Sequence, residues 1–376
     1  MDGLRGVAAA IVVLFHYLCL LYPEVVPGMT PEPIWVSDTP LGLVWNGRFA
    51  VSIFFVLSGF VIAGAAERQP GWIGTKLVLR YLRLALPVFV SVLLAWCLLS
   101  IFPTAASDLS ASMADPSRWL DYTHQGDIPT LWRAAADGFV GNFLRGGSMF
   151  NNVLWTMQIE LFGSFGLFIF YWLAPRRHRI ALLAVGGVAI LILVHDAYLA
   201  FVFGALLYEA HMRAALRNLP IVLAVVALIA GVVLGAPGPG WSERWGLDFI
   251  PEKWMVGYPD GVIPVLAATF LLCAILKLPM CQRALSASIP RWLGRISFSL
   301  YLVHVPLLYT LVAFAYVRFD IHPGTLAALY GIITLTLAHY FTIAVDLRVL
   351  TLLKYASGIS TRIEANWRRP PPHRIT

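Results

Sequence analysis

Residues 1–23 read MDGLRGVAAAIVVLFHYLCLLYP, and their apolar run is long enough to cross a bilayer, which takes roughly 20 residues. Two ionisable side chains interrupt the run: Arg5 stands near its start and His16 deep inside it. At about 100° of rotation and 1.5 Å of rise per residue, the two share one helix face and lie roughly 16 Å apart along the axis. The stretch therefore predicts a membrane helix that presents a cation and an imidazole to the same neighbours.

An ionisable side chain inside a spanning helix costs on the order of 3 kcal/mol at the bilayer centre, so its presence favours a functional role. The alternative for Arg5 is a topological anchor that snorkels to the interface. The alternative for His16 is a hydrogen bond between helices. For the isolated pair, the sequence leaves both interpretations open.

The composition places the chain among integral membrane proteins. Its 376 residues are 59% hydrophobic and 12% charged, with a mean hydropathy of +0.76. The formal charge of +7 comes from short basic clusters between apolar runs, which favours topology determination and excludes a nucleic-acid partner. The four cysteines form no CxxC pair, and no metal site is predicted.

A scan for spanning lengths predicts an all-α fold, a polytopic membrane helix bundle of about ten transmembrane helices. The predicted segments are 4–22, 49–66, 84–102, 154–173, 179–195, 197–212, 219–236, 262–278, 296–317 and 325–347. The fifth and sixth are short and separated by few residues, so they are the weakest of the set.

The sidedness of the basic residues supports this count. Every other connection between segments is rich in Arg and Lys, as an even number of crossings with both termini in the cytoplasm requires. We expect residues 1–350 to form one membrane domain and residues 351–376 a basic, proline-rich cytoplasmic tail. The predicted location is the inner membrane of a bacterial cell, in contact with its lipids.

A carboxylate interrupts the fourth segment, in NNVLWTMQIELFGS (151–164). Counted from opposite ends of their helices, Glu160 and His16 reach similar depths. A carboxylate at that depth would orient the imidazole and raise its basicity, which predicts a pair. The alternative is that Glu160 pairs with Arg145 or Arg48 near the external face.

Two further polar patterns lie in other segments. In GRISFSLYLVHVPLL (294–308), Ser297, Tyr301 and His304 form a stripe on one helix face, for which a structural role is as plausible as a functional one. His339 is predicted to pack. Small residues such as Gly59 are predicted to allow close helix contact.

A basic pair precedes the third segment, in KLVLRYLRLALP (76–87). Arg80 and Arg83 carry guanidinium groups that suit phosphates, because these groups stay charged and donate bidentate hydrogen bonds. Positive-inside anchoring explains the same residues without any ligand.

Together these segments resemble the acyltransferase-3 family. The similar stretches are DGLRGVAAAIVVLFH, FFVLSGFVI, RYLRLALP, WTMQIELF and ISFSLYLVH, in this order, and they extend from Asp2 to about Pro306. The resemblance implies an integral membrane enzyme of about ten helices. Such an enzyme moves an acyl group, most often acetyl from cytoplasmic coenzyme A, onto carbohydrate hydroxyls.

The resemblance also implies roles for individual residues. Arg5 and His16 match the family's pair of arginine, ten residues and histidine, Glu160 its glutamate after the tryptophan, and Arg80 and Arg83 its basic motif. The chain departs from the pattern at Ser52, where the family often has aspartate, so that carboxylate has no counterpart here.

These observations predict a membrane O-acyltransferase with His16, Glu160 and Arg5 at the reaction centre. Acetyl-CoA would be the co-substrate, with its phosphates at Arg80 and Arg83 and with Arg5 near the mouth of the site. His16 would act as general base or carry the acyl group itself. The predicted acceptor is a carbohydrate or a lipid-linked glycan.

The acceptor is predicted to contact Trp155, Tyr301 and His304, and external Trp119, Tyr122 and Trp132 are further candidates for stacking on sugar rings. The rival prediction is a secondary transporter that uses His16 and Glu160 for proton coupling. Neither paired broken segments nor an internal repeat favours that rival. The oligomeric state does not follow from the sequence.

Overall fold

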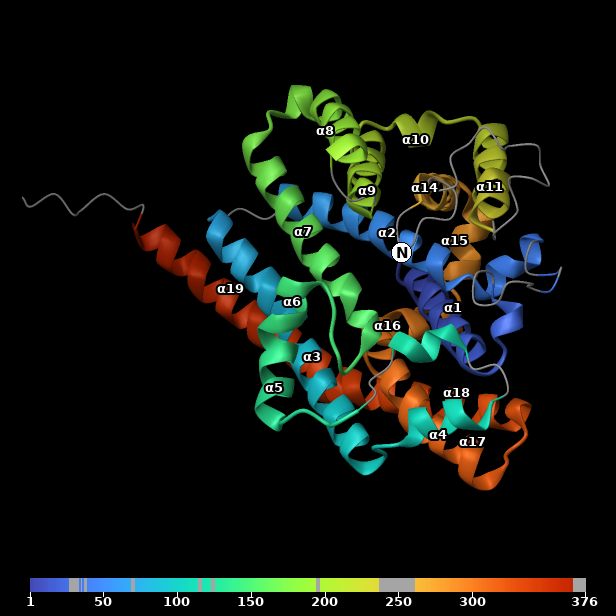
Figure 1. Cartoon of the computed structure of the whole chain (residues 1–376). Helices are drawn as coiled ribbons and strands as arrows, with labels where there is room; N and C mark the ends of the chain where they lie inside the picture. Colours follow the sequence, from blue (N-terminus) through green and yellow to red (C-terminus); the bar gives the residue numbers. More distant parts are fainter. Residues whose placement is uncertain are drawn as a thin grey trace, which may run out of the picture.

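The computed structural model describes residues 1–26, 34, 36, 39–68, 72–113, 117–122, 126–193, 197–236 and 261–367. Across these ranges every regular element is helical, and none is a strand. Figure 1 shows the helices gathered into one bundle, with α8 and α10 at the top, α4 and α17 at the bottom, and α19 leaving at the left. The predicted all-α helix bundle is confirmed.

Six helical stretches in these ranges are long and apolar enough to span a membrane. They are Asp2–Leu21 (α1), Gly47–Arg68 (α2), Ile73–Ile101 (α3), Asn152–Leu173 (mostly α7, Trp155–Leu173), Ser288–Phe319 and Pro323–Gly358. The fifth consists of α16 (Ser288–Leu307), a π-helical turn (η8, Leu308–Val312) and α17 (Ala313–Phe319). The sixth contains α18 (Pro323–Phe341), a second π-helical turn (η9, Thr342–Asp346) and the first part of α19 (Leu347–Trp367).

The other four predicted segments are also helical in their described residues, but they are shorter. They are α8 (Arg179–Leu193), α9 (Ala197–Met212), α11 (Ile221–Gly235) and α14 (Val262–Lys277). After α14 the chain bends by 97° into α15 (Pro279–Leu285). At 1.5 Å per residue, helices of this length fall short of a 30 Å hydrocarbon core.

Short helices fill most of the connections. They are η1 (Pro23–Val25), η3 (Pro40–Trp45), α4 (Ala105–Ser112), η4 (Arg118–Tyr122), α5 (Leu131–Ala136), a π-helical turn η5 (Asp137–Gly141), α6 (Asn142–Arg145), η6 (Asn152–Leu154), η7 (Arg176–His178) and α10 (Ala215–Asn218). At the C-terminal end, α19 runs past residue 350, where the sequence predicts the tail to begin, as far as Trp367. Residues 368–376 of the predicted tail lie outside the described ranges.

Helix α3 begins about three turns earlier than predicted, at Ile73 instead of residue 84. No glycine or proline interrupts residues 75–86, so the helix continues through the basic pair. Arg80 and Arg83 therefore project from the second and third turns of α3, and the prediction that they precede the helix is wrong. This shift decides where both guanidinium groups lie.

Among the described helices, the most extensive contact joins α1 to α16. A Cβ atom at Gly6 would lie 2.4 Å from the backbone nitrogen of Gly294, and one at Gly294 would lie 2.1 Å from the carbonyl oxygen of Asp2. Only glycine allows the two backbones to approach this closely. The crossing brings His16 of α1 beside α16.

Gly59 similarly permits contact between α2 and α9. A Cβ atom at Gly59 would lie 2.4 Å from the Phe201 carbonyl oxygen, which confirms the predicted packing role of Gly59.

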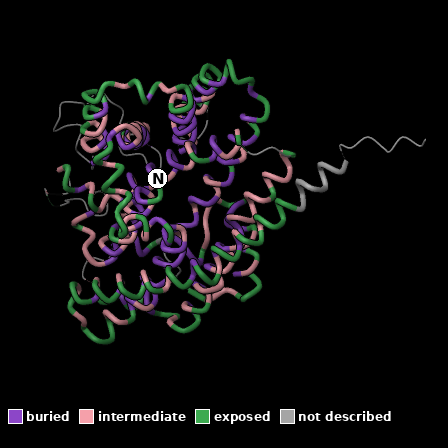
Figure 2. Tube along the Cα trace, turned by 180° about the vertical axis from the view of Figure 1, so that it is seen from behind, coloured by how far each residue is buried: buried purple, intermediate pink, exposed green. Residues whose placement is uncertain are grey.

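Burial follows the layout of a membrane bundle (Figure 2). Buried residues concentrate where α1, α2, α3, α7 and α16 meet, while α8 and α11 expose large apolar side chains such as Val185, Ile192 and Val222. In water such a surface would be a liability, but facing lipid chains it costs nothing. The helices that carry His16, Arg80 and Glu160 meet in this buried central region.

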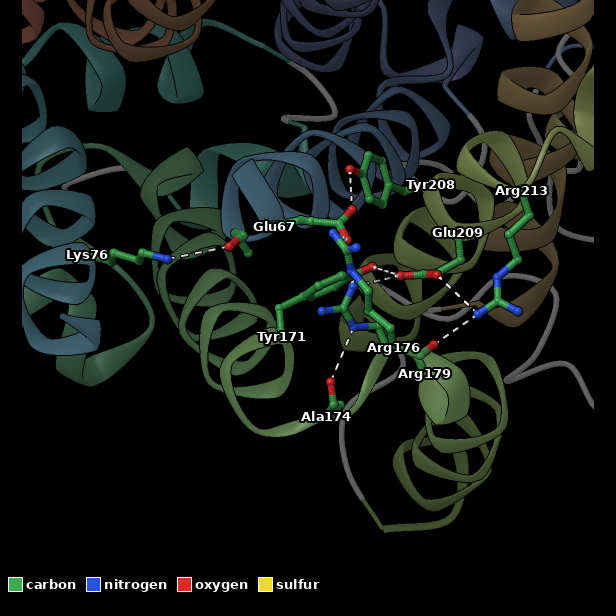
Figure 3. Close-up of polar contacts among 10 residues, drawn as sticks. Glu67, Lys76, Tyr171, Ala174, Arg176, Arg179, Tyr208, Glu209 and Arg213 are labelled. Atoms are coloured by element: carbon green, nitrogen blue, oxygen red, sulfur yellow. Dashed lines mark hydrogen bonds and ion pairs between the residues drawn. The ribbon is translucent and has the colours of Figure 1, made fainter. Parts of the chain in front are cut away.

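Four helices are joined by one ionic cluster, which consists of Glu67, Arg176, Arg179, Glu209 and Arg213 (Figure 3). Arg176 and Arg179 each lie 2.9 Å from a Glu67 carboxylate oxygen, and Arg213 lies 3.6 Å from Glu209. Tyr208 and Tyr171 donate hydrogen bonds to the two glutamates. The cluster draws together the ends of α2, α7, α8 and α9, so the basic connections next to these ends lie on one side of the bundle, as the alternation of basic connections predicts.

Candidate active site

His16 and His304 form a hydrogen-bonded pair in the middle of the bundle. The Nδ1 atom of His16 lies 3.1 Å from the Nε2 atom of His304 and 3.0 Å from the carbonyl oxygen of Val12. The Nδ1 atom of His304 lies 2.8 Å from the carbonyl oxygen of Tyr301. His304 is fully buried, and the two rings stand 5.1 Å apart at an angle of 49°.

These contacts assign the hydrogens of both rings. Carbonyl oxygens only accept, so the Nδ1 atom of His304 must carry its proton and its Nε2 atom must accept. His16 then donates from Nδ1 to His304 and to Val12, which leaves a lone pair on the His16 Nε2 atom. That nitrogen has no hydrogen-bond partner in the part of the chain described here. The geometry therefore presents one basic nitrogen, oriented by a second histidine.

His16 lines a small cavity of about 30 Å³, together with Arg48, Val51, Trp155 and Tyr301. The volume admits a small group such as a hydroxyl. The Trp119 ring, 5% exposed, stands 5.6 Å from the His16 ring. Trp132 is 79% exposed, and the side chain of Tyr122 lies outside the described set.

Glu160 bonds to Arg80 and not to His16. An Arg80 guanidinium nitrogen forms an ion pair with the Glu160 carboxylate, and Ser58 donates to the same carboxylate oxygen at 2.8 Å. Arg80 also donates to Ser164 at 2.9 Å. The early start of α3 explains the difference, because it carries Arg80 into the bundle opposite α7. The predicted contact with His16 is replaced by the contact of His16 with His304.

Arg145, one of the two alternative partners that the sequence suggested for Glu160, is engaged elsewhere. Arg145 forms an ion pair with Asp137, which also accepts a hydrogen bond from Ser148 at 2.5 Å. Burial raises the pKa of the Asp137 carboxyl, while the hydroxyl of Ser148 and the cation of Arg145 lower it. Arg145 is therefore not the partner of Glu160, which pairs with Arg80 instead.

A large cavity of about 490 Å³ adjoins the small one. At one end it is lined by Arg5, Trp292 and Arg295, and at the other it reaches Val51 and Tyr301, which also line the cavity of His16. Its volume is that of a typical site for a small molecule or cofactor. The two cavities thus meet at shared walls, and together they run from the N-terminal end of α1 to His16.

The walls of the large cavity are charged. Four arginines and three carboxylates line it: Arg5, Arg80, Arg83, Arg295, Asp2, Glu160 and Asp346. Besides the pair of Arg80 and Glu160, an Arg83 nitrogen lies 2.5 Å from Asp346, and an Arg5 nitrogen lies 3.7 Å from Asp2. Asp346 belongs to the π-helical turn between α18 and α19, a distortion often found at functional sites. The balance of these groups favours an anionic ligand.

The predicted acceptor residues lie near His16. Tyr301 and Trp155 line the small cavity beside His16, and His304 contacts the His16 ring directly. Tyr301 also donates to the carbonyl oxygen of Val153 at 2.8 Å and lies 2.8 Å from the Thr156 hydroxyl, so it holds α16 against α7 as well. Ser297 bonds to the carbonyl oxygen of Gly294 within its own helix.

Several residues of the site escaped the sequence analysis. Ser58 was given no role and His339 a packing role, yet Ser58 bonds to Glu160 and His339 is exposed on the wall of the large cavity. Arg48 entered only as an alternative partner of Glu160, and Arg295 only as one of the basic residues between the apolar segments. Asp346 gave no signal, because its contact with Arg83 depends on the turn that precedes α19. Within the described ranges, no three His, Cys, Asp or Glu residues come together as metal ligands would.

A polytopic helical bundle that holds an oriented histidine beside a large, cation-lined cavity has the features of a membrane-embedded group-transfer enzyme. Comparison with known proteins identifies the particular family. The chain belongs to the acyltransferase-3 family, because the family model, described as "Acyltransferase domain", matches residues 1–343. The protein is therefore an acyltransferase, and the transporter is no longer favoured.

Two relatives are similar over most of their length. An "O-acetyltransferase PaAT-1" of Phomopsis amygdali is 22% identical over 363 residues, which cover 83% of this chain and 72% of the relative. An "Acyltransferase R4" of Phoma sp. (strain ATCC 20986 / MF5453) is 25% identical over 387 residues, which cover 81% of each. No solved structure matches the chain.

Proposed function

We propose that this acyltransferase moves an acyl group, most simply acetyl, from cytoplasmic acyl-CoA to a carbohydrate hydroxyl of a surface or exported glycan. The observation that carries the proposal is the pair of adjoining cavities. One is large and lined by cations, and the other is small and holds the free nitrogen of His16. An anionic thioester and a hydroxyl then meet at the wall that both cavities share.

The donor occupies the large cavity. Its acyl end lies beside Tyr301, and its anionic end lies toward Arg5 at the N-terminal end of α1. Arg80 and Arg83 line the cavity between these ends. Each of them already bonds to a carboxylate, so they set the charge and shape of the channel around the donor. Because basic connections lie on the cytoplasmic side, the mouth of this cavity faces the donor pool, with both termini inside the cell.

His16 acts as the general base. Its Nε2 atom takes the proton of the acceptor hydroxyl as the oxygen forms a bond to the thioester carbonyl carbon. Collapse of the tetrahedral intermediate breaks the carbon–sulfur bond, and the imidazolium returns the proton to the departing thiolate. The products are the ester and free coenzyme A, and no other reactant is needed.

His304 is the positioning residue of this step. Its Nε2 atom accepts from the Nδ1 atom of His16, which fixes the tautomer and stabilises the imidazolium. Arg48 lines the same small cavity, so its positive charge stabilises the negative charge of the intermediate. Glu160 supports the reaction indirectly by holding Arg80 in the wall of the donor cavity.

The acceptor approaches from the side of the small cavity. Trp119 and Trp155 lie around His16, and aromatic faces of this kind suit sugar rings. With the donor in the cytoplasm and the termini inside, a glycan carried on a membrane lipid is the acceptor that the geometry fits best. The bacterial inner membrane is the proposed location.

Purified protein in detergent tests the proposal directly. With radiolabelled acetyl-CoA and a lipid-linked glycan fraction, we expect ester-linked label on the glycan and release of coenzyme A, and both are lost in His16→Ala. In parallel, the glycan from cells with and without the protein is compared by mass spectrometry, and one ester-linked group is expected to disappear. Flux of a solute across proteoliposomes without consumption of thioester would instead support a carrier and overturn the proposal.

A further inference from the structure

Three side chains at the outer end of the donor cavity have no role in the scheme above. Trp292 and Arg295 project from adjacent turns of α16, and His339 projects from α18. All three line the large cavity. The rings of Trp292 and His339 lie 6.5 Å apart with an angle of 36° between their planes. Two flat rings and one guanidinium therefore share the end of the cavity that Arg5 also lines.

Arg295 differs from the other arginines of this cavity. Arg5, Arg80 and Arg83 each have a carboxylate partner, whereas Arg295 is exposed and forms no ion pair or hydrogen bond with any residue in the described ranges. The Trp292 indole N–H also donates to no described acceptor. These groups are thus free to bind a ligand that carries both negative charge and a flat ring.

We propose that Arg295 binds the pyrophosphate of acyl-CoA and that Trp292, with His339 beside it, stacks on the adenine ring. Guanidinium groups bind phosphates through bidentate, charge-assisted hydrogen bonds. Stacking of a base on an aromatic side chain is worth about 1–3 kcal/mol. The proposal rests on the proposed function, since it assigns the nucleotide end of the same donor site.

The spacing along α16 fits the length of the donor. Arg295 and His304 are separated by nine residues, or roughly 14 Å of helix axis at 1.5 Å per residue. The pantetheine arm between thioester and pyrophosphate has about a dozen bonds. An extended chain advances roughly 1.2 Å per bond, so the arm spans about the same distance. A pyrophosphate at Arg295 thus places the thioester near the histidine pair.

Anchoring offers a simpler explanation, since aromatic and basic residues are common at membrane interfaces. Arg291 separates the two explanations. It lies one turn before Arg295 on the same helix and is also exposed, but it does not line the cavity. An anchoring role would affect both arginines alike, whereas a ligand role affects Arg295 alone.

Three donors of decreasing size test the proposal with the full-length protein. Acetyl-CoA has pyrophosphate and adenine, S-acetyl-4′-phosphopantetheine has a phosphate only, and S-acetyl-pantetheine has neither. We expect Arg295→Gln to raise KM about tenfold for the first two donors and to leave the third unchanged. Trp292→Leu is expected to raise KM about tenfold for acetyl-CoA alone, and Arg291→Gln to match the wild type with every donor.

The results separate a wrong nucleotide assignment from a wrong proposed function. Equal changes for all three donors, or no change in either variant, would overturn the nucleotide assignment while the wild-type enzyme still transfers acetyl. The wild-type enzyme failing to transfer acetyl from any of the donors would overturn the proposed function itself, and this inference with it. Thermal midpoints of all variants, measured in detergent, identify any loss of folding.

Discussion

The ionic cluster of Figure 3 and the histidine site, formed by His16 and His304, are both groups of polar residues inside an apolar bundle. They differ in whether a polar atom is left without a partner. In the cluster, Glu67 and Glu209 are each surrounded by arginines and tyrosines, and Arg179 stacks on the Tyr171 ring at 4.6 Å. None of its residues lines the cavities of the active site. The histidine site adjoins two cavities and keeps a free nitrogen on His16.

This difference shows that buried charge alone does not mark function in a membrane bundle. A charge that is fully paired and surrounded by packed helices contributes to assembly, because removing one partner strands the other. A polar group that keeps an unpaired atom beside a cavity is available to a ligand. The two regions should therefore respond to substitution in opposite ways: changes in the ionic cluster lower stability, and changes at the histidine site lower activity.

Replacement of His16 should produce the largest loss of activity. General base catalysis contributes about 10²–10⁴-fold, so we expect His16→Ala to lower kcat by about 10³-fold with acetyl-CoA as donor. Its thermal midpoint should stay close to that of the wild type, because the His16 ring already borders a cavity and is not packed on every side. A residual activity above one tenth of the wild type would contradict the role of His16.

The ionic cluster should show the reverse pattern. Arg179 is 7% exposed and faces two glutamates, so Arg179→Met leaves buried negative charge and should cost about 3 kcal/mol of stability. We expect a thermal midpoint several degrees lower and a kcat of the folded protein within twofold of the wild type. Arg177→Met, on the exposed neighbour, serves as the matched control and should change neither. A large drop in kcat without loss of stability would erase the contrast between the two regions.

His304 tests whether the orienting contact matters beyond packing. His304→Leu removes the acceptor for the Nδ1 proton of His16, and we expect kcat to fall about 100-fold. His304→Gln supplies an oxygen at similar reach, so it should retain roughly ten times more activity than the leucine variant. A merely structural role predicts the opposite order, because leucine suits a buried apolar site better than glutamine does.

The pair of Arg83 and Asp346 gives the smallest and most diagnostic effect. Asp346 is 5% exposed, so Arg83→Met alone should lower the thermal midpoint, and the double variant Arg83→Met with Asp346→Leu should recover it. Because Asp346 engages the Arg83 charge, KM for acetyl-CoA in the double variant should stay within about threefold of the wild type. A KM that remains tenfold higher after recovery of stability would assign Arg83 to the donor phosphates.

Much of the fold followed from local patterns in the sequence. The ten predicted apolar segments are largely helical in their described residues, and Gly59 allows the close helix contact predicted for it. The start of α3 was missed because Arg80 and Arg83 were read as belonging to a connection, although nothing in residues 75–86 breaks a helix. Helix α9 has the bounds predicted for it, and α8, α11 and α14 end or begin within two residues of their predicted segments.

The site was predicted in part. His16 was predicted from a local signal, one ionisable residue in an apolar helix, and the structure places it on the wall of a small cavity. Its partner was misassigned to Glu160, because depth along two helices does not determine which faces meet, and the glycine contact of α1 with α16 selects His304 instead. Arg295 and His339 belong to the site through the shape of a cavity, which no single segment encodes.

Labelling with S-(bromoacetyl)-CoA tests most directly whether the acyl end of the bound donor lies beside His16. The reagent carries an alkylating carbon next to the thioester carbonyl, and attack by the imidazole forms a stable carbon–nitrogen bond as bromide leaves. We expect mass spectrometry to find one modification on the peptide that contains His16, and excess coenzyme A to suppress it. Modification confined to exposed Cys97 and insensitive to coenzyme A, with His16 unlabelled, would contradict a donor site that ends at the histidine pair.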